Sequence, residues 1–189
     1  MSRLSSRKLD QAAAHYAKIM DILGFDPKNE HSKDTPLRVI RMLEEMTGGM
    51  GSQPECNIPL FANKGDQLVV VNDIPFASMC AHHHAPFIGT AAVGYLPTKY
   101  ITGISKFKRI IDHFSARPQT QEDLVNEVAD FLNSKLKPRA VFVYMKAAHT
   151  CMGARGVRTP CSDTITTTVR GPDSLLPHLK SEFYELLRK

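Results

Sequence analysis

Long apolar runs are absent from this chain of 189 residues. A membrane-spanning helix needs roughly 20 apolar residues in succession, so we expect no membrane partner. The first residues, "MSRLSSRKLDQ", have no apolar stretch behind their basic side chains, which argues against a secretory signal. Internal repeats, low-complexity tracts and a convincing linker are also missing. These absences predict a cytoplasmic protein built as one domain with room for a short appendage.

Cysteine is scarce, and its four positions are Cys56, Cys80, Cys151 and Cys161. An even number would permit disulfides in an oxidising compartment. In a reducing cytoplasm, a cysteine beside histidines is more typical of a metal ligand or a catalytic group.

Excess charge is small, with a formal net charge of +5. Such a charge suits a small anionic substrate, for example a nucleotide, at least as well as it suits nucleic acid. The chain has no aromatic stacking run on a predicted strand and no zinc-finger spacing. We therefore expect no nucleic-acid partner.

The hydrophobic pattern predicts two helices, two strands, two helices, two strands and a final helix. Helices are expected at 8–23, at about 34–47, at 105–114 with Ser105 as cap, at about 119–136, and from near Pro177 onward. Strands are expected in "DQLVVVND", "FIGTAAVGYLP", "RAVFVYMKA" and "DTITTTVRG", and glycines in the second could permit a bulge. Short links between adjacent strands favour antiparallel pairing, so the predicted class is α+β.

The segment "SMCAHHHAPFIG" gathers four soft donors within five residues, Cys80 and His82 to His84. Thiolate and imidazole are the ligands that zinc prefers, and a catalytic zinc keeps one position open for water. On an extended strand, Cys80, His82 and His84 would share a face. In a turn, Cys80 and His83 come together instead, so spacing alone leaves the ligating histidine open.

A further ligand is expected from "AAHTCMGARGVR", which follows an apolar strand. If the strand continues, His149 and Cys151 point to the same side. Cys56 and Cys161 have no histidine neighbour and are weaker candidates. A closed structural zinc site with two cysteines and two histidines is the main alternative to an open catalytic one.

Two other segments are suited to a nucleotide. In "GISKFKRI", Lys106 and Arg109 lie beside Ser105 at a predicted helix start, where amides and cations favour phosphate, although a solvated basic face is the simpler interpretation. In "RPQTQEDL", Gln121 and Glu122 could bind the polar edge of a purine, or Glu122 could be an ordinary acid of the first helical turn.

Together these segments resemble the zinc-dependent GTP cyclohydrolase I family, from about Thr35 to the C-terminus. The matching motifs are "DTPLRV", "SMCAHH", "GYLP", "GISK", "RPQTQE" and "HTCMGARGVR", in the family's order. The resemblance implies the tunnelling fold, a ββααββ antiparallel sheet with helices on one face, preceded by N-terminal helices. We accordingly expect an N-terminal helical region at 1–50 and a catalytic domain at 51–189.

The resemblance also implies roles for individual residues. Cys80, His83 and Cys151 match the zinc ligands, and His82 and His149 match the catalytic histidines. The substrate-binding positions that it implies are Gln121 and Glu122 for guanine, and Ser105, Lys106, Arg109, Arg155 and Arg38 for the triphosphate.

The implied reaction is hydrolysis and rearrangement of GTP to 7,8-dihydroneopterin triphosphate with release of formate. The implied assembly is a homodecamer whose active sites are shared between subunits. Two positions depart from the family pattern: Ala81 replaces the usual glutamate, and His84 replaces an apolar residue. Both departures bear on rate, metal preference and substrate. The alternative functions are a related tunnelling-fold enzyme with a changed purine or pterin substrate or a changed metal, against which the joint zinc and triphosphate motifs argue, and a zinc-stabilised nucleic-acid-binding module.

Overall fold

The computed structural model describes residues 4–26, 29–52, 58–159, 162–174 and 176–188. Cys56 and Cys161 lie outside these ranges. Within them, no helix is both long enough and apolar enough to cross a membrane.

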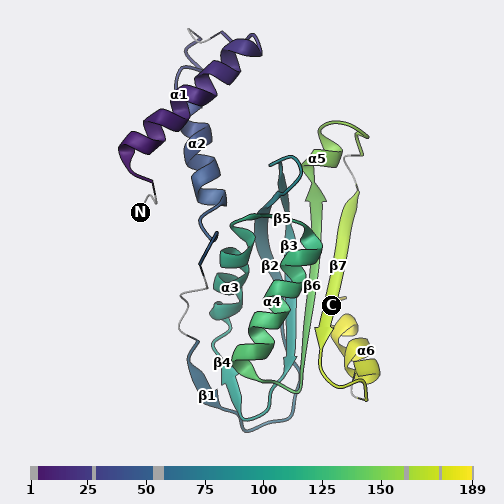
Figure 1. Cartoon of the computed structure of the whole chain (residues 1–189). Helices are drawn as coiled ribbons and strands as arrows, with labels where there is room; N and C mark the ends of the chain where they lie inside the picture. The colour runs from purple at the N-terminus through teal and green to yellow at the C-terminus, as the bar shows by residue number, and fades with distance from the viewer. Residues whose placement is uncertain (1–3, 27–28, 53–57, 160–161, 175, 189) are drawn as a thin grey trace.

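Two helices precede the sheet and pack against each other, α1 (Ser6–Ile22) and α2 (Thr35–Met46). They extend away from the rest of the chain (Figure 1). Gly24 follows α1 with a φ of 80°, the left-handed conformation that commonly ends a helix. Asp34 is the N-cap of α2 and Pro36 lies in its first turn, in agreement with the sequence pattern.

One five-stranded sheet forms the body of the chain (Figure 1). In spatial order its strands are β5 (Pro118–Gln119), β2 (Val69–Cys80), β3 (Pro86–Leu96), β6 (Ala140–His149) and β7 (Asp163–Arg170). Neighbouring strands are antiparallel, except that β5 runs parallel to the end of β2. A separate antiparallel pair consists of β1 (Leu60–Ala62) and β4 (Tyr100–Thr102).

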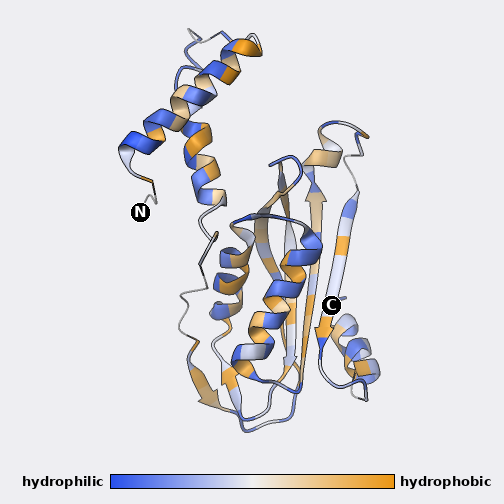
Figure 2. Ribbon diagram, viewed as in Figure 1, coloured by the Kyte–Doolittle hydropathy of each residue, from blue (hydrophilic) through white to orange (hydrophobic). Residues whose placement is uncertain are grey.

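One face of the sheet is covered by α3 (Ser105–Ser115) and α4 (Gln121–Leu136) (Figure 1). Side chains alternate along a strand, and Ala91, Val93 and Tyr95 of β3 point to this side. They join the main hydrophobic core beneath the two helices. In Figure 2, hydrophilic and hydrophobic residues alternate along both helices, as expected for amphipathic helices packed on a sheet.

The opposite face carries a smaller core. Ala92 and Leu96 of β3 pack there with Leu179 and Phe183 of the C-terminal helix α6 (Leu176–Leu186). The order β2, β3, α3, α4, β6, β7 confirms the predicted α+β class and the ββααββ unit.

The irregularity predicted for the second strand lies in the first one instead. The register of β2 against β3 shifts between Val71 and Ile74, and Asp73 there has a φ of 51°. Gly89 in β3 has another purpose, because a Cβ at this position would meet the carbonyl oxygen of Lys146 at 1.9 Å. Glycine therefore permits close approach of β6 rather than a bulge.

Two helix starts also differ from the sequence prediction. Ile104 is the N-cap of α3, and no side-chain bond caps the helix, so the capping role expected of Ser105 is wrong. At α4, the hydroxyl of Thr120 accepts from the backbone N–H of Asp123 at 3.1 Å. The helix begins at Gln121 rather than Gln119, because Gln119 pairs with β2.

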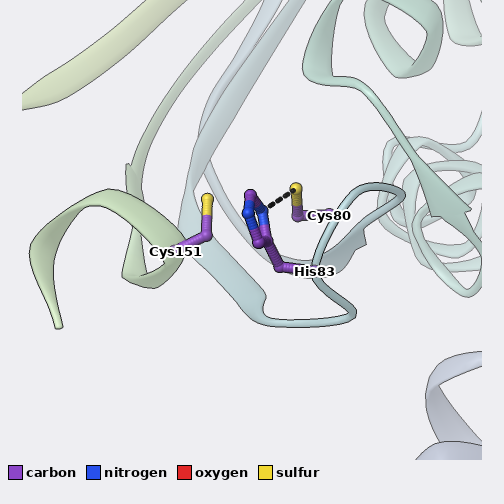
Figure 3. Close-up of side chains that lie close together, drawn as sticks. All are labelled: Cys80, His83 and Cys151. Carbon is purple, nitrogen blue, oxygen red and sulfur yellow. Dashed lines mark hydrogen bonds between the residues drawn. The ribbon is translucent and has the colours of Figure 1, made fainter. Parts of the chain in front are cut away.

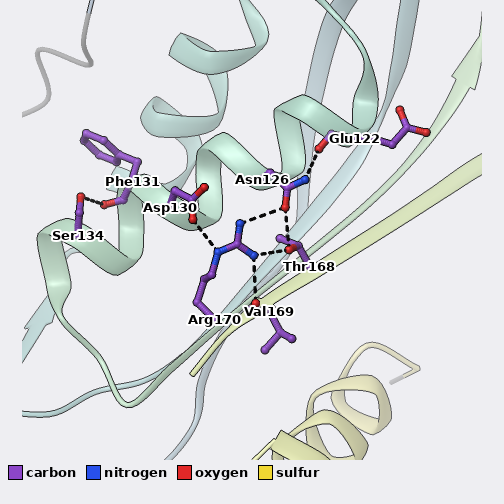
Figure 4. Close-up of polar contacts among 8 residues, drawn as sticks. All are labelled: Glu122, Asn126, Asp130, Phe131, Ser134, Thr168, Val169 and Arg170. Atoms are coloured by element: carbon purple, nitrogen blue, oxygen red, sulfur yellow. Dashed lines mark hydrogen bonds and ion pairs between the residues drawn. The ribbon is translucent and has the colours of Figure 1, made fainter. Parts of the chain in front are cut away.

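Arg170 at the end of β7 fastens this strand to α4 (Figure 4). Its guanidinium donates to Asp130 Oδ1 at 2.6 Å and to Asn126 Oδ1 at 3.1 Å. It also donates to the Thr168 hydroxyl at 2.6 Å. The network joins the outer strand to the helix whose first turn reaches the candidate site.

Candidate active site

The end of β2, the start of β3 and the end of β6 meet at one end of the sheet, where Met79 pairs with Pro86 and Phe87 pairs with His149. A cavity of about 330 Å³ lies here. Its lining residues are Cys80, His82, His83, Gln119, Thr120, Gln121, Glu122, His149, Cys151, Met152 and Thr164. Strand ends and the first turn of α4 thus bring four separate segments of the sequence into one site.

Cys80, His83 and Cys151 converge in this cavity (Figure 3). A turn follows β2, in which the N–H of His84 donates to the carbonyl of Cys80 at 2.9 Å. The turn places His83 Nδ1 3.8 Å from Cys80 Sγ. The three ligand atoms all lie within 4.8 Å of one another, so this Cys–His–Cys group could hold a metal ion.

The donor set suits zinc in both chemistry and spacing. Zinc–sulfur bonds of about 2.3 Å and zinc–nitrogen bonds of about 2.0 Å place sulfur and nitrogen about 3.5 Å apart in a tetrahedral site. The observed Cys80–His83 separation is 3.8 Å. Two thiols and one imidazole would leave one of four positions free.

The neighbouring histidines lie differently. His82 Nδ1 is 3.7 Å from Cys80 Sγ, but His82 is not in the group whose ligand atoms are mutually close among the described residues. His84 is exposed, has a φ of 50° and is also outside that group. The turn thus favours His83 over the extended arrangement that would have paired Cys80 with His82 and His84.

The sequence pattern had suggested that Cys151 lies on a continuation of the strand. The structure shows that the strand ends before it. β6 ends at His149, and Cys151 lies in the helical turn α5 (Thr150–Gly153). Burial raises the pKa of the Cys151 thiol, and the adjacent Cys80 raises it further, while the cation of Arg155 opposes both effects. A bound cation would reverse this balance, because metal ligation requires the thiolate.

His149 is held on two sides. Its ring stacks on Phe87 with 4.6 Å between centroids and 3° between planes. Its Nε2 lies 2.9 Å from Gln121 Oε1. Burial lowers the pKa of His149, and the carboxylate of Glu122 opposes that shift. The ring is therefore favoured as neutral imidazole while it faces a carboxylate that can stabilise its protonated form.

Glu122 is exposed in the first turn of α4 and lines the cavity. Within the described part of the chain, its carboxylate has no hydrogen-bond partner, although its backbone carbonyl accepts from Asn126 (Figure 4). An unpaired carboxylate beside a potential metal group is available to a ligand's N–H donors.

A sequence model described as GTP cyclohydrolase I matches residues 12–188. The chain belongs to the GTP cyclohydrolase I family.

Several relatives are named GTP cyclohydrolase 1. The one from Carboxydothermus hydrogenoformans is 46% identical over 155 residues, which cover 81% of each chain. The one from Listeria welshimeri is 40% identical over 190 residues, covering 100% of this chain and 99% of the relative. The crystal structure of the archaeosine synthase QueF-Like in the apo form has a TM-score of 0.48 and 18% identity, covering 58% of this chain and 98% of that one.

In this GTP cyclohydrolase I family member, the predicted phosphate residues are not gathered in the cavity. Ser105, Lys106 and Arg109 lie in the first turns of α3, which follows β4, whereas the cavity lies beyond the other end of α3. At a rise of about 1.5 Å per residue, Ser105 lies about 15 Å and Arg109 about 9 Å along the helix axis from Ser115, the last residue of α3. Within one chain, these residues therefore lie apart from Cys80.

Arg38 and Arg155 occupy two further places. Arg38 is exposed on α2 and pairs with Asp34 at 3.2 Å. Arg155 follows α5, and its cation acts to lower the pKa of the Cys151 thiol, although Arg155 is not among the residues that line the cavity.

Sequence reasoning missed five side chains at the site. Phe87 supports the ring of His149, and the other four line the cavity: Gln119, Thr120, Met152 and Thr164. Phe87 looked like an ordinary strand residue because its only signal was the apolar run. Its pairing opposite His149 depends on the register of β3 and β6.

Proposed function

We propose that this chain converts GTP to 7,8-dihydroneopterin triphosphate and formate, as a zinc-dependent GTP cyclohydrolase I. The observation that carries the proposal is the convergence of Cys80, His83 and Cys151 with His149 and Glu122 in one cavity. Membership of the family supports the same conclusion.

Cys80, His83 and Cys151 would hold the zinc. When bound, zinc would lower the pKa of a coordinated water towards about 7, which supplies a nucleophile at neutral pH. The thiols must remain reduced to serve as ligands, which supports a cytoplasmic location.

His149 is proposed as the residue that exchanges protons with the guanine ring. Carbon 8 of guanine is a poor electrophile until N7 is protonated, and His149 lines the cavity from the end of β6. Its lowered pKa favours release of a proton once it has been taken up. His82, which also lines the cavity, would move protons during ring opening.

Glu122 is proposed to accept hydrogen bonds from N1–H and the exocyclic amine of guanine. Its free carboxylate at the cavity supports this role. Gln121, expected at the same edge, has its amide bonded to protein groups, so we propose that it assists through His149.

The triphosphate is proposed to bind between subunits of a homodecamer. Arg155 would come from the chain that holds the metal group, and Ser105, Lys106 and Arg109 from a neighbour. Their separation from the cavity within one chain supports sharing. We retain the division into an N-terminal helical region (1–50), which would deliver Arg38 to another subunit, and a catalytic domain (51–189).

The test is incubation of zinc-loaded protein with GTP while formate and pterin absorbance are followed. We expect both products in equal amounts. Turnover of another purine nucleotide in place of GTP would instead indicate the related enzyme suggested by Ala81 and His84. Absence of formate from GTP in fully metallated, correctly assembled protein would refute the proposal.

A further inference from the structure

Gln121 is among the most deeply buried polar residues described, with 1% of its surface exposed. It stands at the start of α4 and reaches under His149 to the sheet. Its Nε2 lies 3.1 Å from the carbonyl of Met145, 3.1 Å from the carbonyl of Thr164 and 3.0 Å from the hydroxyl of Thr166. The amide nitrogen is thus enclosed by oxygen atoms of β6 and β7.

These oxygens fix which way the amide points. The carbonyls of Met145 and Thr164 can only accept hydrogen bonds, so they require the NH₂ group of Gln121. A reversed amide would bring its oxygen against both carbonyls and bury unpaired acceptors, at a cost of about 1–3 kcal/mol for each unsatisfied group. Oε1 must therefore face His149.

The direction of the amide in turn fixes the proton on His149. Oε1 of Gln121 is an acceptor only, and it lies 2.9 Å from Nε2. A neutral imidazole has one N–H and one lone pair, so the N–H must be at Nε2. Stacking on Phe87 holds the ring plane in place. Among the described residues, Nδ1 has no hydrogen-bond partner.

We propose that Gln121 is a positioning residue that holds His149 in the Nε2–H tautomer and leaves Nδ1, which has no partner among the described residues, as the nitrogen available to a ligand. The tautomer follows from the amide contacts alone, whereas the identity of that ligand as the guanine base rests on the proposed function.

The role of Gln121 therefore differs from the guanine-binding role that was expected of it. Its amide oxygen and nitrogen are already engaged with His149 and the sheet, so it has no donor left for the base. Glu122, next in sequence, is exposed and lines the cavity. The two adjacent residues thus have different roles in the proposal: Gln121 positions His149, and Glu122 binds the substrate.

The test is ¹⁵N NMR of histidine-labelled, zinc-loaded, full-length protein, with the His149 signals identified by their loss in His149→Ala. We expect a pyrrole-type shift for Nε2 and a pyridine-type shift for Nδ1. The opposite pattern in the wild-type protein would overturn the proposal, whether or not any variant folds.

Three variants separate positioning from substrate binding. Gln121→Met removes the acceptor, so the tautomer signature should be lost, and kcat should fall about 10–100-fold while KM changes by less than about twofold. Gln121→Glu retains an oxygen facing Nε2 but sets its second oxygen against the carbonyls of Met145 and Thr164, so it should keep Nε2 protonated while lowering the stability of the fold. Thr166→Val removes one acceptor but leaves both carbonyls, so it should also keep the signature.

The remaining outcomes are decisive as well. A raised KM with unchanged kcat in Gln121→Met would show that Gln121 binds substrate, and would overturn the proposal. A signature that is present in wild-type protein and lost in Gln121→Met supports the positioning role even if GTP is not turned over. In that case the proposed function alone would fail.

Discussion

Two regions proposed to bind substrate differ in what one chain supplies: the cavity at the end of the sheet and the first turns of α3. At the cavity, the metal group, His149 and Glu122 converge from β2, α4, β6 and α5. At the start of α3, Lys106 and Arg109 lie apart from that cavity. The groups proposed for bond-breaking therefore come together within one chain, while three of those proposed for the triphosphate, Ser105, Lys106 and Arg109, lie apart from them.

The largest effect is expected from Cys151→Ser, which removes one of three ligands from the cavity end. A hydroxyl is a poor replacement for thiolate at zinc, so bound metal should be lost. Activity should fall by a factor on the order of 10³ or more, since the metal supplies several kcal/mol. Metal content by plasma mass spectrometry and formate release check this. Cys56→Ser is the matched control, and full zinc stoichiometry with tight binding in Cys151→Ser would contradict the ligand assignment.

His149→Ala should abolish turnover by roughly 10²–10⁴-fold, the usual contribution of a general acid or base. The bound metal should stay near normal, because His149 is outside the group of mutually close ligand atoms. Formate release and zinc content, measured on one preparation, test both statements. His178→Ala on α6 serves as control. Loss of metal in step with activity would mean that His149 is a ligand.

Glu122→Ala tests the substrate side of the same cavity. Losing a charge-assisted pair to the base should cost on the order of 2–5 kcal/mol in GTP binding or turnover. Steady-state kinetics with GTP measure this cost as a fall in kcat/KM. Glu182→Ala on α6 should leave kcat/KM unchanged. An unchanged value for Glu122→Ala would show that guanine is bound elsewhere.

Subunit mixing tests the comparison directly. Arg109→Ala and His149→Ala should each be inactive, yet mixtures under subunit exchange should recover part of the activity. Recovery is expected because a shared site can take each intact residue from a different chain. Light scattering should first establish the assembly, for which we expect a decamer. No recovery despite demonstrated exchange would place both residues in one subunit's site, and a fully active monomer would exclude sharing altogether.

The smallest effect on chemistry is expected from Arg170→Ala, which loosens β7 from α4. The pair with Asp130 is partly exposed, so the loss should be about 1 kcal/mol of unfolding free energy. Urea denaturation measures this loss, and kcat should change little. Arg188→Ala near the C-terminus is the control. A large fall in kcat without loss of stability would show that the contacts of Arg170 with α4 affect the cavity.

Much of the fold followed from local pattern. The helices at 105–114 and 119–136 and three of the four long strands were predicted within a few residues, because apolar periodicity reports which face is buried. The first strand was expected to end at Asp73, but it continues through an irregularity to Cys80. The short elements β1, β4, β5 and α5 were not predicted, since two to four residues carry no measurable period. The bulge was predicted in the wrong strand, because Gly89 of β3 permits the close approach of β6 and does not mark a bulge.

The sequence by itself determined the chemistry available to this protein: soft donors at 80, at 82 to 84 and at 151, a further histidine at 149 and a carboxylate at 122. Tertiary structure decided which histidine turns towards the two thiols, and that Cys151 lies on a helical turn rather than a strand. It also decided the contacts of Gln121, whose partners for the amide nitrogen lie 24 to 45 residues away. Residue types set which bonds can form, but only the register of β6, β7 and α4 places a particular amide between two carbonyls and an imidazole.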